Sequence, residues 1–200
     1  MTRPALLSRA SSGLALCVLL LAGCAHTPKP DYYVLSTPAG AAGERMRAGP
    51  TLGLGPITLP EYLDRPQIVT RASDSRLVLS NEHRWAEPLA ASFARALHTA
   101  LERALPDQSV ALHPWRSTLT LQRQVRLDVT RFERDASGSF HLSARWSVSA
   151  LDAEQSVDTR VLDIDIPVNG KQDDYDALVA AANGAVAALA TTIASQLQAP

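Results

Sequence analysis

Apolar side chains recur every fourth residue between positions 89 and 105, which is the spacing of one face of an α-helix. This pattern predicts a helix over residues 86–105. Pro88 is tolerated only in the first turn of a helix and Pro106 cannot continue one, so both ends of the helix are bounded. The stripe consists of Leu89, Phe93, Leu97, Leu101 and Leu105.

A second helical stripe lies near the C-terminal end of the chain. It predicts a helix over about residues 173–197, and the acidic residues of its first turn complement the positive end of the helix dipole. The apolar positions of this stripe are Tyr175, Leu178, Val179, Ala182, Val186, Leu189, Ile193 and Leu197.

Between the two helices the period changes from four to two. The alternation over residues 140–150 predicts a β-strand with one buried and one solvated face. Its expected partners are residues 121–132 and 157–168, joined to it through turns at 135–138 and 152–155. The side chains expected on the buried face are Phe140, Leu142, Ala144, Trp146, Val148 and Ala150.

Shorter apolar runs predict the remaining strands, which number about six or seven in total. These runs cover residues 32–35, 52–57, 67–71, 77–79 and 109–115, with a Gly- and Pro-rich loop over 38–50 and a second loop over 60–66. Two helices and this number of strands predict a single α+β domain. We expect both helices to pack on one face of an antiparallel or mixed sheet.

The N-terminus carries a secretory signal. Arg3 and Arg9 precede an apolar run over residues 14–22, which is shorter than the ~20 residues that a membrane-spanning helix needs. The run closes with Leu21-Ala22-Gly23-Cys24, which resembles the signal of bacterial lipoproteins. The resemblance implies cleavage before Cys24, attachment of two or three acyl chains to it, and, because Ala25 follows, transfer to the outer membrane.

An ordinary secretory signal that happens to precede a cysteine is the alternative. Cys17 would leave with that signal, so Cys24 would be an unpaired thiol in an oxidising compartment. The lipoprotein interpretation divides the chain into a signal peptide over residues 1–23, a lipidated tether with a flexible segment over 24–50, and an α+β domain over 51–198. Two or three acyl chains suffice for stable membrane anchoring, whereas a single chain binds only marginally.

Composition and motifs narrow the function further. Removal of the signal peptide leaves 17 basic against 20 acidic residues, a net charge of about −3 that gives no electrostatic reason to expect nucleic-acid binding. The five histidines show no metal-ligand spacing, and no nucleophile, dinucleotide or phosphate-loop motif is present. We therefore expect no catalytic residues, no metal and no cofactor. Asp163 and Asp165 alternate with Ile164 and fit a half-solvated strand better than an acid/base pair.

Two blocks of the sequence, residues 59–71 (LPEYLDRPQIVTR) and 82–89 (EHRWAEPL), resemble the PqiC-type lipoproteins, the auxiliary lipoprotein family of ABC-type transport systems. The resemblance implies a protein tethered to the outer membrane, without enzymatic activity. It implies partners of two kinds, a periplasm-spanning protein of MCE type and an inner-membrane transporter subunit. The implied role is lipid movement between the membranes and envelope integrity, with self-association into a homo-oligomer also expected.

The loop over residues 60–66 is the candidate partner interface. Tyr62, Leu63 and Arg65 combine an aromatic, an aliphatic and a guanidinium group, which are enriched at the centres of protein interfaces. The alternative is that this loop folds back on the core of its own domain. At the level of the whole protein, the alternative function is that of a stand-alone periplasmic lipoprotein that binds a lipid or a peptide.

Overall fold

The computed structural model describes residues 29–36, 51–115, 119–150 and 158–198. The predicted signal peptide, Cys24, the loop over 38–50 and the turn over 152–155 lie outside these residues. In chain order the elements are β1 (Asp31–Tyr33), β2 (Thr51–Thr58), the 3₁₀ turn η1 (Glu61–Leu63), β3 (Gln67–Ser73), β4 (Arg76–Trp85), α2 (Leu89–Ala104), β5 (Ser109–Leu112), β6 (Arg123–Arg134), β7 (Ser139–Ala150), β8 (Asp158–Pro167) and α3 (Tyr175–Gln198).

One mixed sheet contains all eight strands, and β6 lies at its centre. Along one edge, β6 pairs antiparallel with β7, which in turn pairs antiparallel with β8. Along the other edge, β6 pairs in parallel first with β2 and then, at its final residue, with β3. Strand β5 extends the sheet beyond β2, and β4 and β1 extend it beyond β3.

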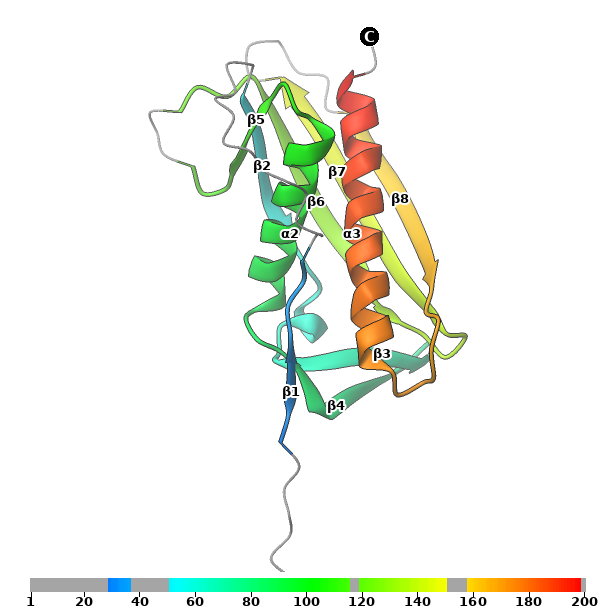
Figure 1. The fold of residues 1–200 in the computed structure, drawn as a ribbon. Coiled ribbons are helices and arrows are strands. Elements are labelled where there is room, and N and C mark those ends of the chain that lie inside the picture. The colour runs from blue at the N-terminus through cyan, green and yellow to red at the C-terminus, as the bar shows by residue number, and fades with distance from the viewer. Residues whose placement is uncertain (1–28, 37–50, 116–118, 151–157, 199–200) are drawn as a thin grey trace, which may run out of the picture.

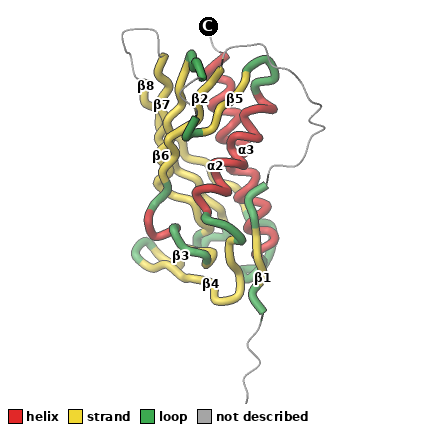
Figure 2. Tube along the Cα trace, turned by 90° about the vertical axis from the view of Figure 1, so that its left-hand side faces the viewer, coloured by secondary structure: helices red, strands yellow, loops and turns green. Residues whose placement is uncertain are grey.

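Both helices cover the same face of this sheet, as Figures 1 and 2 show from two directions. Helix α3 packs on β7 and β8, α2 packs on β2 and β5, and the two helices contact each other. The predicted fold class is confirmed: the protein is a single α+β domain with two helices on one face of a mixed sheet. We call the helix-covered side of the sheet its inner face and the opposite side its outer face.

The stripe that predicted α2 is buried along its entire length. The helix begins at Leu89, three residues later than predicted, because Pro88 has the extended backbone of a cap residue (φ −51°, ψ 127°). Phe93 connects the helix to the sheet: its ring meets that of Phe132 edge-on at 5.3 Å between centroids, and Phe132 meets Phe140 edge-on at 4.8 Å. Edge-to-face contacts of this kind add to the stabilisation from burial alone.

Helix α3 is long and apolar enough to cross a membrane by length and composition. In the structure, 56% of its most apolar window is buried inside the domain. Ala182, Ala185 and Val186 are fully buried. The apolar character of α3 is therefore explained by its position as a core helix, because a helix that is buried over much of its surface needs a wide apolar face.

The predicted antiparallel meander of β6, β7 and β8 is present, with register Phe132 opposite Leu142 and Leu142 opposite Ile164. The alternation along β7 places its side chains as expected as far as Trp146, whereas Val148 is half-buried and Ala150 is exposed. At the β6–β7 turn, Gly138 has φ +89°, a conformation that glycine adopts without steric cost.

The sheet also includes residues that precede position 51. Strand β1 pairs in parallel with the end of β4, and the backbone N–H of Leu35, which is buried, donates a hydrogen bond to Ser92 Oγ at 3.0 Å. Strand β4 is correspondingly longer than the predicted run over 77–79, since it continues to Trp85. Strand β5 is shorter than predicted and ends at Leu112.

A charged residue in the centre of the α2 stripe should prevent folding. Phe93 is 0% exposed, so Phe93→Asp places an unpaired carboxylate between helix and sheet at a cost of several kcal/mol. Because a domain is stable by only about 5–15 kcal/mol, we expect the variant to unfold or aggregate, as measured by circular dichroism and size-exclusion chromatography. A variant with unchanged melting temperature would contradict this description of the core.

Candidate functional site

The loop over residues 60–66 leads from β2 to β3 and lies over the end of β6. Its first half is a single 3₁₀ turn, in which the N–H of Leu63 donates to the carbonyl of Pro60 at 2.9 Å and that of Asp64 to Glu61 at 3.0 Å. Its far end is held by the N–H of Trp85, which donates to the carbonyl of Pro66 at 2.6 Å. Backbone hydrogen bonds therefore fix the loop at both ends.

The three residues of the predicted interface occupy different environments within this loop. Leu63 is only 3% exposed and belongs to the hydrophobic core, as the alternative interpretation of the loop expected. Tyr62 and Arg65 each keep part of their surface exposed. Leu63 thus anchors the loop, and the surface that the loop presents to other molecules consists of Tyr62, Arg65 and the exposed side chains of Glu61 and Asp64.

A buried carboxylate lies beneath Tyr62. The side chain of Glu133 in β6 is 0% exposed and accepts four hydrogen bonds. The donors are the hydroxyl of Tyr62 at 2.6 Å, Nε of Arg71 at 2.7 Å, Nε of Arg131 at 3.1 Å and the backbone N–H of Phe132 at 3.2 Å. The Arg71 guanidinium also lies 5.9 Å from the centre of the Tyr62 ring, within cation–π range. This set, Tyr62, Arg71, Arg131 and Glu133, is called the Glu133 cluster below.

The cluster holds Glu133 in its charged form. Burial alone raises the pKa of this carboxyl, but the hydrogen bonds from Tyr62, Arg71 and Phe132 outweigh burial and hold the pKa below its ordinary value. Burial, followed by the hydrogen bond to Glu133, raises the pKa of Tyr62 to about 12. The phenol is therefore a protonated donor to a charged acceptor throughout the neutral pH range, which is the stronger kind of hydrogen bond.

The next residue, Arg134, is buried on the inner face of the same strand. Its guanidinium donates hydrogen bonds to the carbonyls of Lys171, at 3.3 Å, and Gln172, in the turn before α3. Burial lowers the pKa of Arg134 below its ordinary value. Two consecutive charged residues of β6 are thus buried on opposite faces, where one holds the loop over 60–66 and the other holds the start of α3.

A second group of titratable residues surrounds His141 on β7. Its Nε2 lies 2.7 Å from Asp135 Oδ2, and its Nδ1 contacts Asp165. Burial alone raises the pKa of Asp135, but the hydrogen bonds from Ser137 and His141 lower it to about 2. Both ring nitrogens are engaged with carboxylates, so neither is free to accept a proton from a nucleophile. In the described part of the chain, no three His, Cys, Asp or Glu residues are grouped so as to hold a metal ion.

Sequence reasoning did not identify the Glu133 cluster. Glu133 lies 71 residues from Tyr62 and 62 residues from Arg71 along the chain, and no local pattern connects them. The only local signal is the apolar–charged alternation around Phe132, which predicts a solvated position for Glu133 because the loop that covers it comes from another part of the chain.

Removal of the Tyr62 hydroxyl should destabilise the domain without a change in its fold. Tyr62→Phe deletes a hydrogen bond to a buried charge, a loss of about 2 kcal/mol, which lowers the melting temperature of a domain of this size by roughly 4–8 °C. The effect should be largest near neutral pH. Because the folded pKa of Glu133 is lowered, the stability it contributes is present above its ordinary pKa of 4.5 and is lost as the pH falls through the folded value.

Thermal unfolding of the wild type and of Tyr62→Phe between pH 3 and pH 8 measures this difference in stability. Tyr32→Phe is the matched control, since Tyr32 is 61% exposed and its hydroxyl can exchange protein contacts for water. We expect the control to melt with the wild type at every pH. Equal melting temperatures for Tyr62→Phe and Tyr32→Phe at neutral pH would show that the Glu133 cluster contributes nothing measurable to stability.

Comparison with solved structures shows the same fold in other proteins. The chain is similar to a crystal structure of an uncharacterised protein with a TM-score of 0.70 and 24% identity, covering 85% of this chain and 99% of that one. It is also similar to a crystal structure of a protein from Xanthomonas campestris with a TM-score of 0.62 and 20% identity, covering 86% of this chain and 94% of that one. At these identities the two structures support the fold alone.

Sequence comparison provides the family. The chain is 28% identical over 135 residues to the intermembrane transport lipoprotein PqiC of Escherichia coli K12, covering 66% of this chain and 71% of the relative, and the values for PqiC of Shigella flexneri are the same. The family model for the ABC-type transport auxiliary lipoprotein component matches residues 33–194, from the last residue of β1 almost to the end of α3. The chain therefore belongs to the family of ABC-type transport auxiliary lipoprotein components.

Proposed function

We propose that the protein is an outer-membrane lipoprotein that acts, on the periplasmic face, as a non-catalytic auxiliary component of an inter-membrane lipid transport system. Its partners are then a periplasm-spanning protein with MCE domains and a transporter subunit of the inner membrane. The observation that carries the proposal is the family match over residues 33–194, behind a lipoprotein-type signal that ends at Cys24. The name of the relatives, intermembrane transport lipoprotein, supports the same role.

The position of β1 fits an anchored domain. Strand β1 enters the domain at the end formed by β3 and β4, while α3 finishes at the opposite end (Figures 1 and 2). Asp31 follows Cys24 by seven positions, so the chain between them spans at most about 25 Å. Acyl chains on Cys24 would therefore keep the β3–β4 end near the membrane and leave the end with β5 and the last turn of α3 towards the periplasm.

The non-catalytic part of the proposal is supported by the chemistry of the described residues. The titratable groups with the largest shifts in pKa belong to two saturated hydrogen-bond networks, the Glu133 cluster and the His141 group. A catalytic acid or base needs a free lone pair or proton directed towards a substrate. An adaptor needs only a stable surface, and both networks stabilise one.

The surface of the loop over 60–66 is the proposed contact for the periplasm-spanning partner. The Glu133 cluster and Leu63 hold this loop in place, so that the partly exposed Tyr62 and Arg65 are presented without a large loss of conformational entropy on binding. Arginine and tyrosine are frequent hot-spot residues in protein interfaces. Self-association of the domain remains a prediction that the same experiments can measure.

Replacement of the acylated residue should release the protein from the membrane. Cys24→Ser cannot form the thioether, so neither acylation nor anchoring should occur. Mass spectrometry of the wild type should show acyl chains on Cys24, and membrane fractionation should find the wild type, but not the variant, in the outer membrane. Outer-membrane retention of the variant, together with an unmodified wild type, would contradict the anchor.

Charge reversal on the loop should weaken partner capture. In an affinity purification from solubilised membranes, we expect Arg65→Glu to recover about tenfold less of the MCE-domain protein than the wild type, since an interfacial charge pair is replaced by repulsion. Arg103→Glu makes the same charge change on the exposed end of α2 and serves as the control. If both variants capture the identified partner equally, the interface lies elsewhere.

The alternative function, a stand-alone lipoprotein that binds a lipid or peptide, is favoured by one observation, an open groove on the outer face of the sheet. Adjacent genes for an MCE-domain protein and a polytopic membrane protein would distinguish the auxiliary role from this alternative. A direct ligand of the groove is also compatible with the auxiliary role, because a component of a lipid transport system can bind lipid itself.

A further inference from the structure

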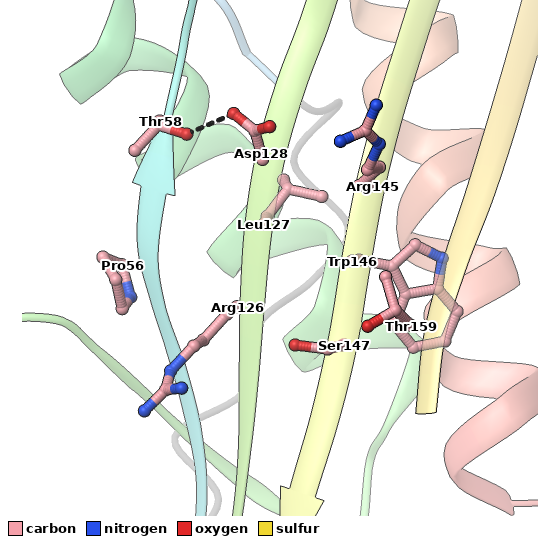
Figure 3. Close-up of a pocket in the computed structure, with 9 residues that line it drawn as sticks. All are labelled: Pro56, Thr58, Arg126, Leu127, Asp128, Arg145, Trp146, Ser147 and Thr159. Atoms are coloured by element: carbon pink, nitrogen blue, oxygen red, sulfur yellow. Dashed lines mark hydrogen bonds between the residues drawn. The ribbon is translucent and has the colours of Figure 1, made fainter. Parts of the chain in front are cut away.

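A groove of about 290 Å³ crosses the outer face of the sheet, opposite the two helices (Figure 3). Four strands contribute to it, and the polar residues among them are Thr58, Arg126, Asp128, Arg145, Ser147 and Thr159. Strand pairing places these side chains on one face, since Thr58 pairs with Asp128, Asp128 with Arg145, and Ser147 with both Arg126 and Thr159. The groove is therefore a feature of the sheet itself.

An irregularity in β2 accounts for the hollow. Leu54 pairs with Val125 and Ile57 with Leu127, so β2 uses three residues where β6 uses two. The extra residue lies at Gly55–Pro56, and an insertion of this kind bends a strand and increases its twist. The side-chain amide of Gln124 donates to the carbonyl of Gly55 at 2.8 Å and so holds the bend. Pro56 forms one wall of the resulting groove.

The acidic and basic side chains in the groove do not pair with one another, which leaves them available to a ligand. Asp128 lies directly opposite Arg145 in the strand register, where opposite charges normally pair. However, the hydroxyl of Thr58 donates to Asp128 Oδ1 at 2.6 Å and holds the carboxylate towards β2, as Figure 3 shows. Within the described part of the chain, the side chain of neither Arg126 nor Arg145 makes a hydrogen bond or an ion pair. Two guanidinium groups thus remain available on either side of one oriented carboxylate.

This combination fits a zwitterion that contains a phosphodiester and an ammonium group. Guanidinium groups bind phosphate oxygens through parallel, charge-assisted hydrogen bonds, and a carboxylate accepts the hydrogen bonds of an ammonium group. The diagonal neighbours Arg126 and Arg145 have Cα atoms roughly 7–8 Å apart, so both flexible side chains can reach one phosphate. Pro56 adds an apolar wall beside these charges, suited to the carbon atoms next to a phosphodiester.

We propose that this groove binds the zwitterionic phosphoethanolamine headgroup of a phospholipid, with the phosphodiester on Arg126 and Arg145 and the ammonium group on Asp128. The inference rests on the proposed role in lipid transport and specifies the lipid class. A groove of about 290 Å³ is at the lower limit for small-molecule sites. It accommodates a headgroup, while the acyl chains extend outside it.

The test uses the acylated mature protein in non-ionic detergent, titrated with dihexanoyl phosphatidylethanolamine. Isothermal titration calorimetry reports binding. We expect saturable binding by the wild type that is weakened about tenfold or more in Arg126→Gln and in Arg145→Gln, because each change removes a charge-assisted contact. Arg103→Gln, with the same loss of charge on α2, should bind like the wild type. All three arginines are exposed, so the melting temperatures should be unchanged.

Two further titrations identify the source of the phosphate. Dihexanoyl phosphatidylglycerol lacks the ammonium group, so it should bind the wild type more weakly than phosphatidylethanolamine does. The two lipids should bind Asp128→Asn with equal affinity, because this variant lacks the carboxylate that accepts hydrogen bonds from the ammonium group. Inorganic phosphate should bind more weakly than either lipid. If inorganic phosphate binds as tightly as the lipid, with the same dependence on the two arginines, the groove is a site for free phosphate and the lipid proposal is wrong.

Absence of saturable binding, or equal binding by the wild type and both arginine variants, would overturn the proposal. Failure of the transport role is a separate outcome, because membrane anchoring and capture of the MCE-domain protein involve Cys24 and Arg65 and not the groove. Binding of the headgroup by a protein that captures no such partner would retain the groove and support the stand-alone lipid-binding function.

Discussion

The central position of β6 is the constraint on which the other elements depend. This strand pairs with β7 along one edge and with β2 and β3 along the other. Through these three partners its backbone hydrogen bonds also determine where the other four strands lie. Its inner-face side chains, among them Val125, Leu127 and Phe132, support both helices. Because one strand joins so many partners, its last two residues, Glu133 and Arg134, end beneath other segments and must be buried with their charges compensated.

That compensation links the fold to the candidate interface. A buried carboxylate is tolerated only when its lone pairs are occupied, and Tyr62 supplies one of the donors to Glu133. The loop over 60–66 therefore completes the sheet as well as connecting two strands, and Leu63 adds an apolar anchor. The hydrogen bond from Tyr62 and the burial of Leu63 restrict the conformational freedom of this loop, which favours it as a docking surface. For the same reason a substitution at Leu63 tests the stability of the domain, whereas one at Arg65 tests its surface.

Sequence patterns predicted those parts of the fold in which neighbours along the chain share an environment. The four-residue period of α2 and the two-residue period of β7 are local, and both were confirmed, as were the turn over 135–138 and the one-sided packing of the helices. The pairing of β1 with β4, the parallel pairing of β3 with β6, and the Glu133 cluster depend on partners about 50 to 70 residues away. Such partners leave no periodic signal, so Glu133 could not be distinguished from a solvated residue.

The position of both helices on one face of the sheet determines where a ligand or partner can bind. The inner face of the sheet is fully used by α2 and α3, since the apolar stripes of both helices pack there and leave Phe93, Leu142 and Leu189 without exposed surface. Binding surfaces must therefore lie on the outer face, on the strand edges or on the loops. On the outer face, Thr58 separates Asp128 from the arginine opposite it. An internal ion pair would neutralise this surface, whereas a carboxylate held apart from two guanidinium groups preserves both signs of charge for a zwitterionic ligand.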